Sequence, residues 1–272
     1  MNIAVTAKRL RTISGLLVPG IALAMLLSSC GPSKEAAVSP PPEKKALTST
    51  FKILSINARH TLKEKSDVRK LSKLIKSTGA EIVAVQQIEK PEDGKEGFDA
   101  VKELAKQTDM YNFFGKARFL DGFDSGNALL SLYPVKSTTV HPLPVGKGKV
   151  RRSLTFGVVD VGLRSVDVGT TELDDQSPAE RVSQTEELYS IAKSYSDELF
   201  IVCGSFYETM SGKAAAKMQD HFSAANELQE STRSAEQQLY VMKSEKIQPI
   251  SAEKVRLGGG VDGLLVTIRV SQ

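Results

Sequence analysis

Short apolar runs alternate with amphipathic segments between Phe51 and Val270, and this alternation constrains the fold more than any other feature of the sequence. Apolar runs bounded by turn residues are typical of buried strands, and apolar residues three or four positions apart indicate helices. The pattern predicts helices at 66–78, 98–106 and 181–195, and strands at 51–57, 82–88, 111–117, 127–132, 135–140, 153–161, 165–171, 199–203, 238–242, 247–255 and 264–270. Helices cluster with the early strands and again with the later ones, which favours an α/β domain of two packed sheets with helices outside.

Size and charge narrow the class further. A chain of 272 residues with 40% apolar residues has enough material for one main domain with a sizeable core. The net charge is +4, but Lys8, Arg9 and Arg11 lie in an N-terminal segment without acids, so the remainder carries only +1. A near-neutral domain lacks the basic field that drives phosphate-backbone binding, and nucleic acid is not expected as a partner.

The first 29 residues have the pattern of a signal peptide. The cationic start is followed by an apolar stretch from Ile13 to Leu27, shorter than the roughly 20 residues of a membrane-spanning helix. Leu27-Ser28-Ser29-Cys30 resembles the bacterial lipobox, and the resemblance implies that Cys30 is lipidated and becomes the mature N-terminus. The chain would then be an extracytoplasmic, membrane-anchored lipoprotein of the bacterial cell envelope, with residues 30–50 as a Pro-rich tether. The alternative is a plain signal peptide with an incidental cysteine.

Two cysteines, Cys30 and Cys203, exclude a framework of disulfides, and their spacing suits no zinc site. Cys203 ends an apolar run. We therefore expect it to be a small buried hydrophobe rather than a reactive thiol.

Four fragments, taken in order, resemble the endonuclease/exonuclease/phosphatase superfamily over residues 51–272. They are Ile53-Leu54-Ser55-Ile56-Asn57, Glu81 to Gln86, Gly126 to Pro134 and Arg181-Val182-Ser183-Gln184. The resemblance implies a four-layer α/β sandwich of two packed β-sheets flanked by helices. It also implies hydrolysis of phosphoester bonds with a divalent metal, usually magnesium.

The first two catalytic positions of that superfamily differ in how well they are kept. Asn57 is retained after the first strand. Gln87 stands where the superfamily has its metal-binding glutamate, within Val85-Gln86-Gln87. An amide keeps a weak oxygen ligand but loses the negative charge on which magnesium sites depend.

The later catalytic motifs are altered as well. Where the superfamily has Thr-His-Leu-Asp, this chain has Glu172 in place of the histidine. The negative charge of Glu172 is expected to repel a phosphate. Gly-Asp-Phe-Asn becomes a sequence with Ser205 and Tyr207 in place of the aspartate and asparagine. Asp262 survives near the C-terminus, but Gly263 replaces the histidine beside it. Gln238 is matched to a further aspartate borne on a strand.

These substitutions predict a catalytically inactive binding domain without a cofactor, whose partner is an unknown protein or small ligand. No catalytic residue set is intact and no metal site is expected. The predicted cleft is lined by Asn57, Gln87, Asp124, Glu172, Tyr207 and Asp262.

Two other readings stay open at this point. One is a magnesium-dependent phosphodiesterase or phosphatase with a rearranged acidic site made of Glu89, Glu172, Glu208 and Asp262. It has no histidine at a position of the superfamily, because the histidines are at 60, 141 and 221. The other is a purely structural protein of the envelope.

Overall fold

The computed structural model describes residues 50–271 except residues 60, 94, 196–197 and 259–260. The expected signal peptide and lipidated Cys30 lie outside this part of the chain, as does the tether except for Thr50, which opens the first strand. No helix in the described residues has the length and apolar character needed to cross a bilayer.

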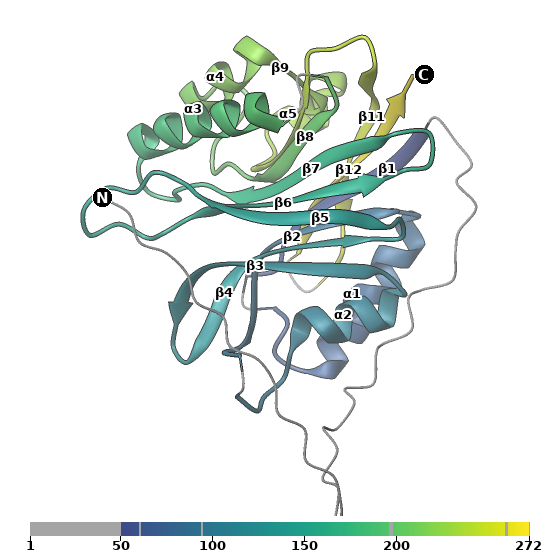
Figure 1. Ribbon diagram of the computed structural model, residues 1–272, viewed down its shortest axis with the longest axis vertical. Helices are drawn as coiled ribbons and strands as arrows, with labels where there is room; N and C mark the ends of the chain where they lie inside the picture. The colour runs from purple at the N-terminus through teal and green to yellow at the C-terminus, as the bar shows by residue number, and fades with distance from the viewer. Residues whose placement is uncertain (1–49, 60, 94, 196–197, 259–260, 272) are drawn as a thin grey trace, which may run out of the picture. The chain divides into compact units, whose positions relative to one another are not determined.

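The described strands form two six-stranded sheets (Figure 1). The first sheet has the order β11 (Ile247–Arg256), β12 (Asp262–Val270), β1 (Thr50–Asn57), β2 (Ile82–Pro91), β4 (Phe123–Ser131) and β3 (Tyr111–Leu120). The second has the order β5 (Val135–Pro142), β6 (Ser153–Asp160), β7 (Ser165–Glu172), β8 (Phe200–Ser205), β10 (Gln237–Met242) and β9 (Phe222–Ala224). β1 pairs with β2, and β7 with β8, in parallel.

The helices cover the outer faces of the two sheets. Apolar residues of α1 (Lys65–Thr78) and α2 (Ala100–Thr108) form one core cluster with β1 and β2. Those of α3 (Pro178–Tyr195) and α4 (Lys213–His221) form another with β6, β8 and β10. The four-layer sandwich expected from the sequence is therefore confirmed. The elements that the apolar pattern did not predict are α4, β9, the 3₁₀ helix η1 (Ala225–Leu228) and the short α5 (Glu230–Arg233).

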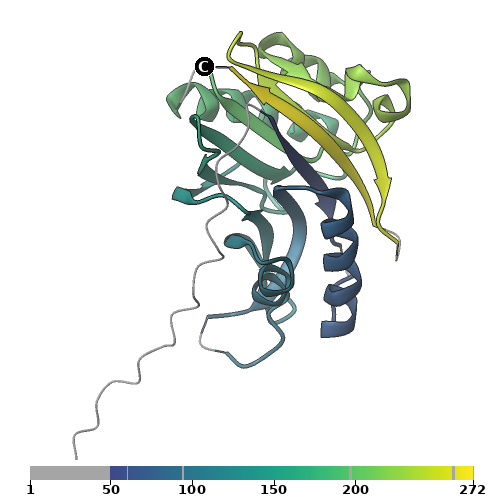
Figure 2. The same cartoon turned by 90° about the vertical axis from the view of Figure 1, so that its right-hand side faces the viewer.

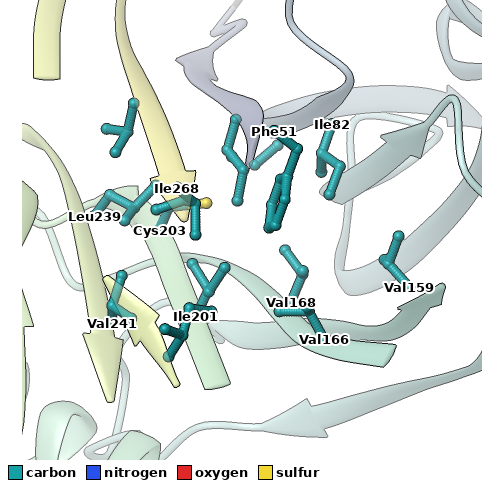
Figure 3. Close-up of a cluster of buried hydrophobic side chains, with 14 of the residues drawn as sticks. Phe51, Ile82, Val159, Val166, Val168, Ile201, Cys203, Leu239, Val241 and Ile268 are labelled. Carbon is teal, nitrogen blue, oxygen red and sulfur yellow. The ribbon is translucent and has the colours of Figure 1, made fainter. Parts of the chain in front are cut away.

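A third cluster fills the space between the sheets (Figure 3). Ile82 and Ile268 of the first sheet meet Val168 and Leu239 of the second, since alternate side chains of each strand face inward. Cys203 is fully buried in this layer, and burial raises the pKa of its thiol to about 12. It is the small buried hydrophobe that the sequence predicted.

The strand directions bring distant residues to one end of the sandwich. β1 and its parallel neighbour β2 carry Asn57 and Gln86 in register. β7 and its parallel neighbour β8 carry Glu172 and Ser205 in register. In open α/β sheets, ligand sites lie outside the carboxyl ends of the parallel strands. The β2–β4 register shifts between Val85 and Ile88, and this bulge re-aims the residues next to that end.

We expect Gly204→Ala to lower the free energy of unfolding by about 3 kcal/mol or more. Gly204 has a φ of 153°, and a Cβ there would lie 1.8 Å from the backbone oxygen of Thr171 on the neighbouring strand. The matched control is Gly148→Ala, where φ is also positive but nothing lies within 4 Å, and its expected cost is about 1 kcal/mol. Urea unfolding of both variants checks this, and equal costs would contradict the packing argument.

Candidate functional site

Tyr207 stands at the centre of the residues that the sequence placed in the catalytic positions. Its hydroxyl donates to Glu172 Oε1 at 2.8 Å, accepts from Asn57 Nδ2 at 3.3 Å, and lies 3.4 Å from Gln87 Oε1. Burial raises the pKa of the phenol, and the neighbouring charge of Glu172 raises it further. The phenol is therefore a neutral hydrogen-bond donor at physiological pH, and it occupies the space between three of the expected site residues.

The backbone that carries this phenol has an unusual conformation. Tyr207 has a φ of 52°, and Gln87 has the same value. A non-glycine residue in the left-handed region costs free energy and persists only where the surrounding structure fixes it. Gln87 lies at the bulge within β2 and Tyr207 follows the end of β8, and the conformation brings the Tyr207 hydroxyl within 3.4 Å of Gln87 Oε1.

A chain of hydrogen bonds continues from Asn57 into the interior. Asn57 Nδ2 donates to Ser205 Oγ at 2.9 Å, and Gln237 Nε2 donates to the same hydroxyl at 2.7 Å. Ser55 Oγ then donates to Gln237 Oε1 at 2.8 Å. Ser55 and Asn57 belong to the first sheet, whereas Ser205 and Gln237 belong to the second. These bonds join the two sheets.

Glu172 is paired with arginines. Arg152 Nη1 forms an ion pair with Glu172 Oε1, but its geometry is not that of a hydrogen bond. Arg118 Nη1 lies 3.7 Å from Glu172 Oε2. A second carboxylate, that of Asp175, extends this group of charges. Its Oδ1 lies 3.1 Å from Arg152 Nη2, and its Oδ2 lies 3.8 Å from Arg59 Nη2. The side chains of Glu172 and Arg152 are only 5% and 2% exposed. The carboxylate expected to repel a phosphate is therefore already balanced by cations.

Asp262 and Gly263 lie at the start of β12. The Asp262 side chain is 52% exposed and lies 3.7 Å from Lys254 Nζ. Gly263 pairs with Ile56, and a Cβ on it would lie 2.9 Å from Ile56 Cγ2 and 3.0 Å from Leu54 Cδ1. Both belong to the core cluster under the helices, so a histidine at 263 would be directed into packed side chains.

A hollow of about 580 Å³ opens beside Tyr207. Most of its lining residues are polar, and they include Arg59, Gln237 and Lys254 together with three residues of the predicted cleft, Asn57, Tyr207 and Asp262.

The other three residues predicted for the cleft lie elsewhere. Gln87 lines a separate hollow of about 380 Å³, and Glu172 is buried beneath the phenol. Asp124 is buried on β4 in an ion pair with Lys116.

The residue of β10 that faces the site is Gln237, not Gln238. Gln238 donates to the backbone oxygen of Glu208 and accepts from Tyr240, on the opposite side of the strand. Side chains alternate along a strand, so an alignment one residue out of step points to the wrong face.

The acids proposed for a rearranged metal site are not assembled. Glu208 pairs with Arg181 at 3.2 Å and accepts from the backbone nitrogen of Ala215 in the first turn of α4. Glu89 lies beyond the bulge of β2, opposite Ser125. In the part of the chain that the structure describes, no group of three or more His, Cys, Asp or Glu residues could hold a metal ion.

Neither of the two described histidines, His141 and His221, lies in the site. His141 shares a hydrogen bond of 2.7 Å with Tyr195, and His221 stacks on Tyr189 at 3.6 Å between ring centroids. His60 lies outside the described residues.

Sequence reasoning missed Arg118, Arg152 and Gln237. Arg152 directly precedes β6, and nothing in its local sequence shows that it meets Glu172. One signal could have indicated an ion pair at Arg152, namely its position next to a strand predicted to be buried. An arginine inside a domain is almost never left unpaired.

No family model matches the sequence, and no curated protein sequence matches it as a relative. Solved structures do match. An endonuclease/exonuclease/phosphatase from Beutenbergia cavernae shares 16% identity over 82% of this chain and 72% of its own, with a TM-score of 0.66. The catalytic domain of human Nocturnin, with a bound sulfate, shares 14% identity over 82% of this chain and 94% of its own, with a TM-score of 0.62.

A mannosyl-6-phosphatase of Bacteroides thetaiotaomicron is similar at 10% identity, covering 82% of this chain and all of its own, with a TM-score of 0.60. At identities this low, the similarity shows a shared fold and nothing more. The chain has the endonuclease/exonuclease/phosphatase fold.

We expect Glu172→Gln to lower the free energy of unfolding by about 3 kcal/mol, because the buried Arg152 then keeps only Asp175 as a charge partner and Arg118 loses its own. Adding Arg152→Met should recover part of that loss, since the poorly compensated buried cation is then removed.

The matched control is Glu227→Gln, which breaks an exposed ion pair with Arg233 of 3.0 Å and should cost less than about 1 kcal/mol. Denaturant unfolding of the four proteins measures these differences. A Glu172→Gln cost no larger than that of the control would show that the buried pair adds nothing.

Proposed function

We propose that this protein is a lipid-tethered binding domain of the bacterial envelope with a catalytically inactive endonuclease/exonuclease/phosphatase fold. The observation that carries the proposal is how the residues at the catalytic positions are engaged. Asn57, Gln87, Glu172 and Ser205 meet one another through hydrogen bonds and through the phenol of Tyr207. These hydrogen bonds direct the groups at one another instead of at a metal ion or an attacking water.

The donor set does not fit a magnesium ion. Magnesium in phosphate-processing sites is held through one or two carboxylates and substrate oxygens. The metal position carries the neutral Gln87. The one buried carboxylate nearby, Glu172, is flanked by Arg118 and Arg152, whose charges oppose a cation. Asp262 is exposed and turned to Lys254. No step of phosphoester hydrolysis is therefore assigned to these residues.

The polar hollow beside Tyr207 is the place where a small ligand is expected to bind. Arg59 and Lys254 line it, and each holds only a long ion pair, of 3.8 and 3.7 Å. Hydroxyl and amide groups of Thr61, Ser234 and Gln237 surround them. Such a lining offers hydrogen-bonding groups to a polar molecule, together with some apolar contact area.

The catalytic prediction is tested on residues 40–272, which contain both described sheets and their helices. We expect no hydrolysis of bis-para-nitrophenyl phosphate above a buffer blank with Mg²⁺ or Mn²⁺, and no rise in melting temperature when either ion is added. A magnesium-dependent phosphodiesterase assayed in parallel serves as the positive control. Metal-dependent turnover that is lost in Asp262→Ala would show instead that the protein is a hydrolase with a rearranged site.

The tether is tested separately in cells. We expect the full chain to incorporate labelled palmitate and to sediment with membranes, because the sequence before Cys30 matches a lipobox. Cys30→Ser should abolish both, whereas Cys203→Ser should leave both unchanged because that thiol is buried. Equal labelling of wild type and Cys30→Ser would rule out the lipid anchor at this residue.

A further inference from the structure

The exposed side of α1 is strongly basic. Lys63 precedes the helix, and Lys65, Arg69, Lys70 and Lys73 lie on its outer side; all five are exposed, and none forms an ion pair with a described residue. The acids of this segment are already engaged at the start of the helix, where Glu64 and Asp67 form a capping box. Five cations against two acids leave the segment from Lys63 to Lys73 with a net charge of +3.

An apolar groove of about 610 Å³ runs beside these cations, between α1 and the end of the β11–β12 hairpin. Figure 2 shows α1, the upright dark blue helix, next to the yellow pair of strands. The floor is made by Leu71, Leu257 and Val261, which are 3–5% exposed, and the partly exposed Leu62 and Leu74 complete its sides. Asp67, Lys70 and Lys73 form the rim.

We propose that this groove binds an acidic segment of a partner protein, with one or more apolar side chains of the segment in the groove and its carboxylates on the lysines of α1. The net positive charge selects an anionic partner. The concave shape selects a protruding chain over a flat membrane surface, because a bilayer would touch the lysines and leave the groove unfilled. Burial of apolar side chains then adds to the electrostatic attraction.

The groove is distinct from the candidate site. It shares only Thr61 with the polar hollow beside Tyr207, and it contains none of the residues at the catalytic positions. Binding here therefore does not depend on whether the old site hydrolyses anything. Failure of either proposal leaves the other standing.

The probe is a fluorescein-labelled peptide of about six residues in which leucine alternates with glutamate, an extended length that matches the roughly 21 Å of α1. Fluorescence anisotropy with residues 40–272 should show saturable binding that weakens as salt is added. Peptides that alternate leucine with lysine, or serine with glutamate, should bind at least about tenfold more weakly, since each lacks one of the two interactions.

Lys70→Glu combined with Lys73→Glu should weaken binding of the leucine–glutamate peptide by at least about tenfold. The matched control, Lys147→Glu with Lys149→Glu, makes the same change of charge at two exposed lysines outside the groove and should leave affinity within about twofold. Melting curves of both variants establish that they are folded.

Three results would overturn the proposal. They are absence of saturable peptide binding below about 1 mM, equal weakening by the two lysine pairs, and binding of phosphatidylglycerol vesicles without binding of the peptide. The last result would identify an anionic lipid surface as the partner instead.

Discussion

The buried contact between Glu172 and Arg152 is the interaction on which this end of the molecule depends. Elsewhere the two sheets meet through an apolar layer, but near the site they meet through polar groups. A buried ion pair of this kind is stable only while both partners remain, since either one alone is an uncompensated charge in a medium that solvates it poorly. Arg118 and Tyr207 supply further contacts to the same carboxylate. The site is thereby part of what holds the sandwich together.

The backbone of the site is strained at two positions, whereas its side chains are hydrogen-bonded to one another. Gln87 and Tyr207 both have φ near 52°, and nothing about a glutamine or a tyrosine favours that conformation. The strain is tolerated because the bulge within β2 and the end of β8 fix the two positions, and because the phenol is anchored by Glu172 and Asn57. A backbone shaped for convergence, carrying side chains that bind one another, is what the proposal of an inactive binding domain leads one to expect.

The sequence predicted the fold where local pattern decides structure. Apolar strands and the amphipathic α1, ended by Gly79 at a φ of 69°, are local properties and were placed within a few residues. Contacts that join distant parts of the chain were not predictable in the same way. Arg152 meets Glu172 only because β6 and β7 pair, and Gln237 rather than Gln238 faces the site because of a register that one residue reverses. Gly263 shows the same limit, since its pairing with Ile56 directs any side chain into the helix-covered core.

The contacts around the site also decide which catalytic residues of the superfamily could be restored one at a time. An aspartate at position 205 would accept from the amides of Asn57 and Gln237, but its charge would be buried where Ser205 is 1% exposed. A histidine at position 172 would leave Arg118 without its carboxylate and Arg152, which is 2% exposed, with Asp175 as its remaining partner. A histidine at position 263 would meet Ile56 and Leu54. The barrier to rebuilding a phosphoesterase on this chain is therefore the packing and charge balance of the sheet interface more than any single missing residue.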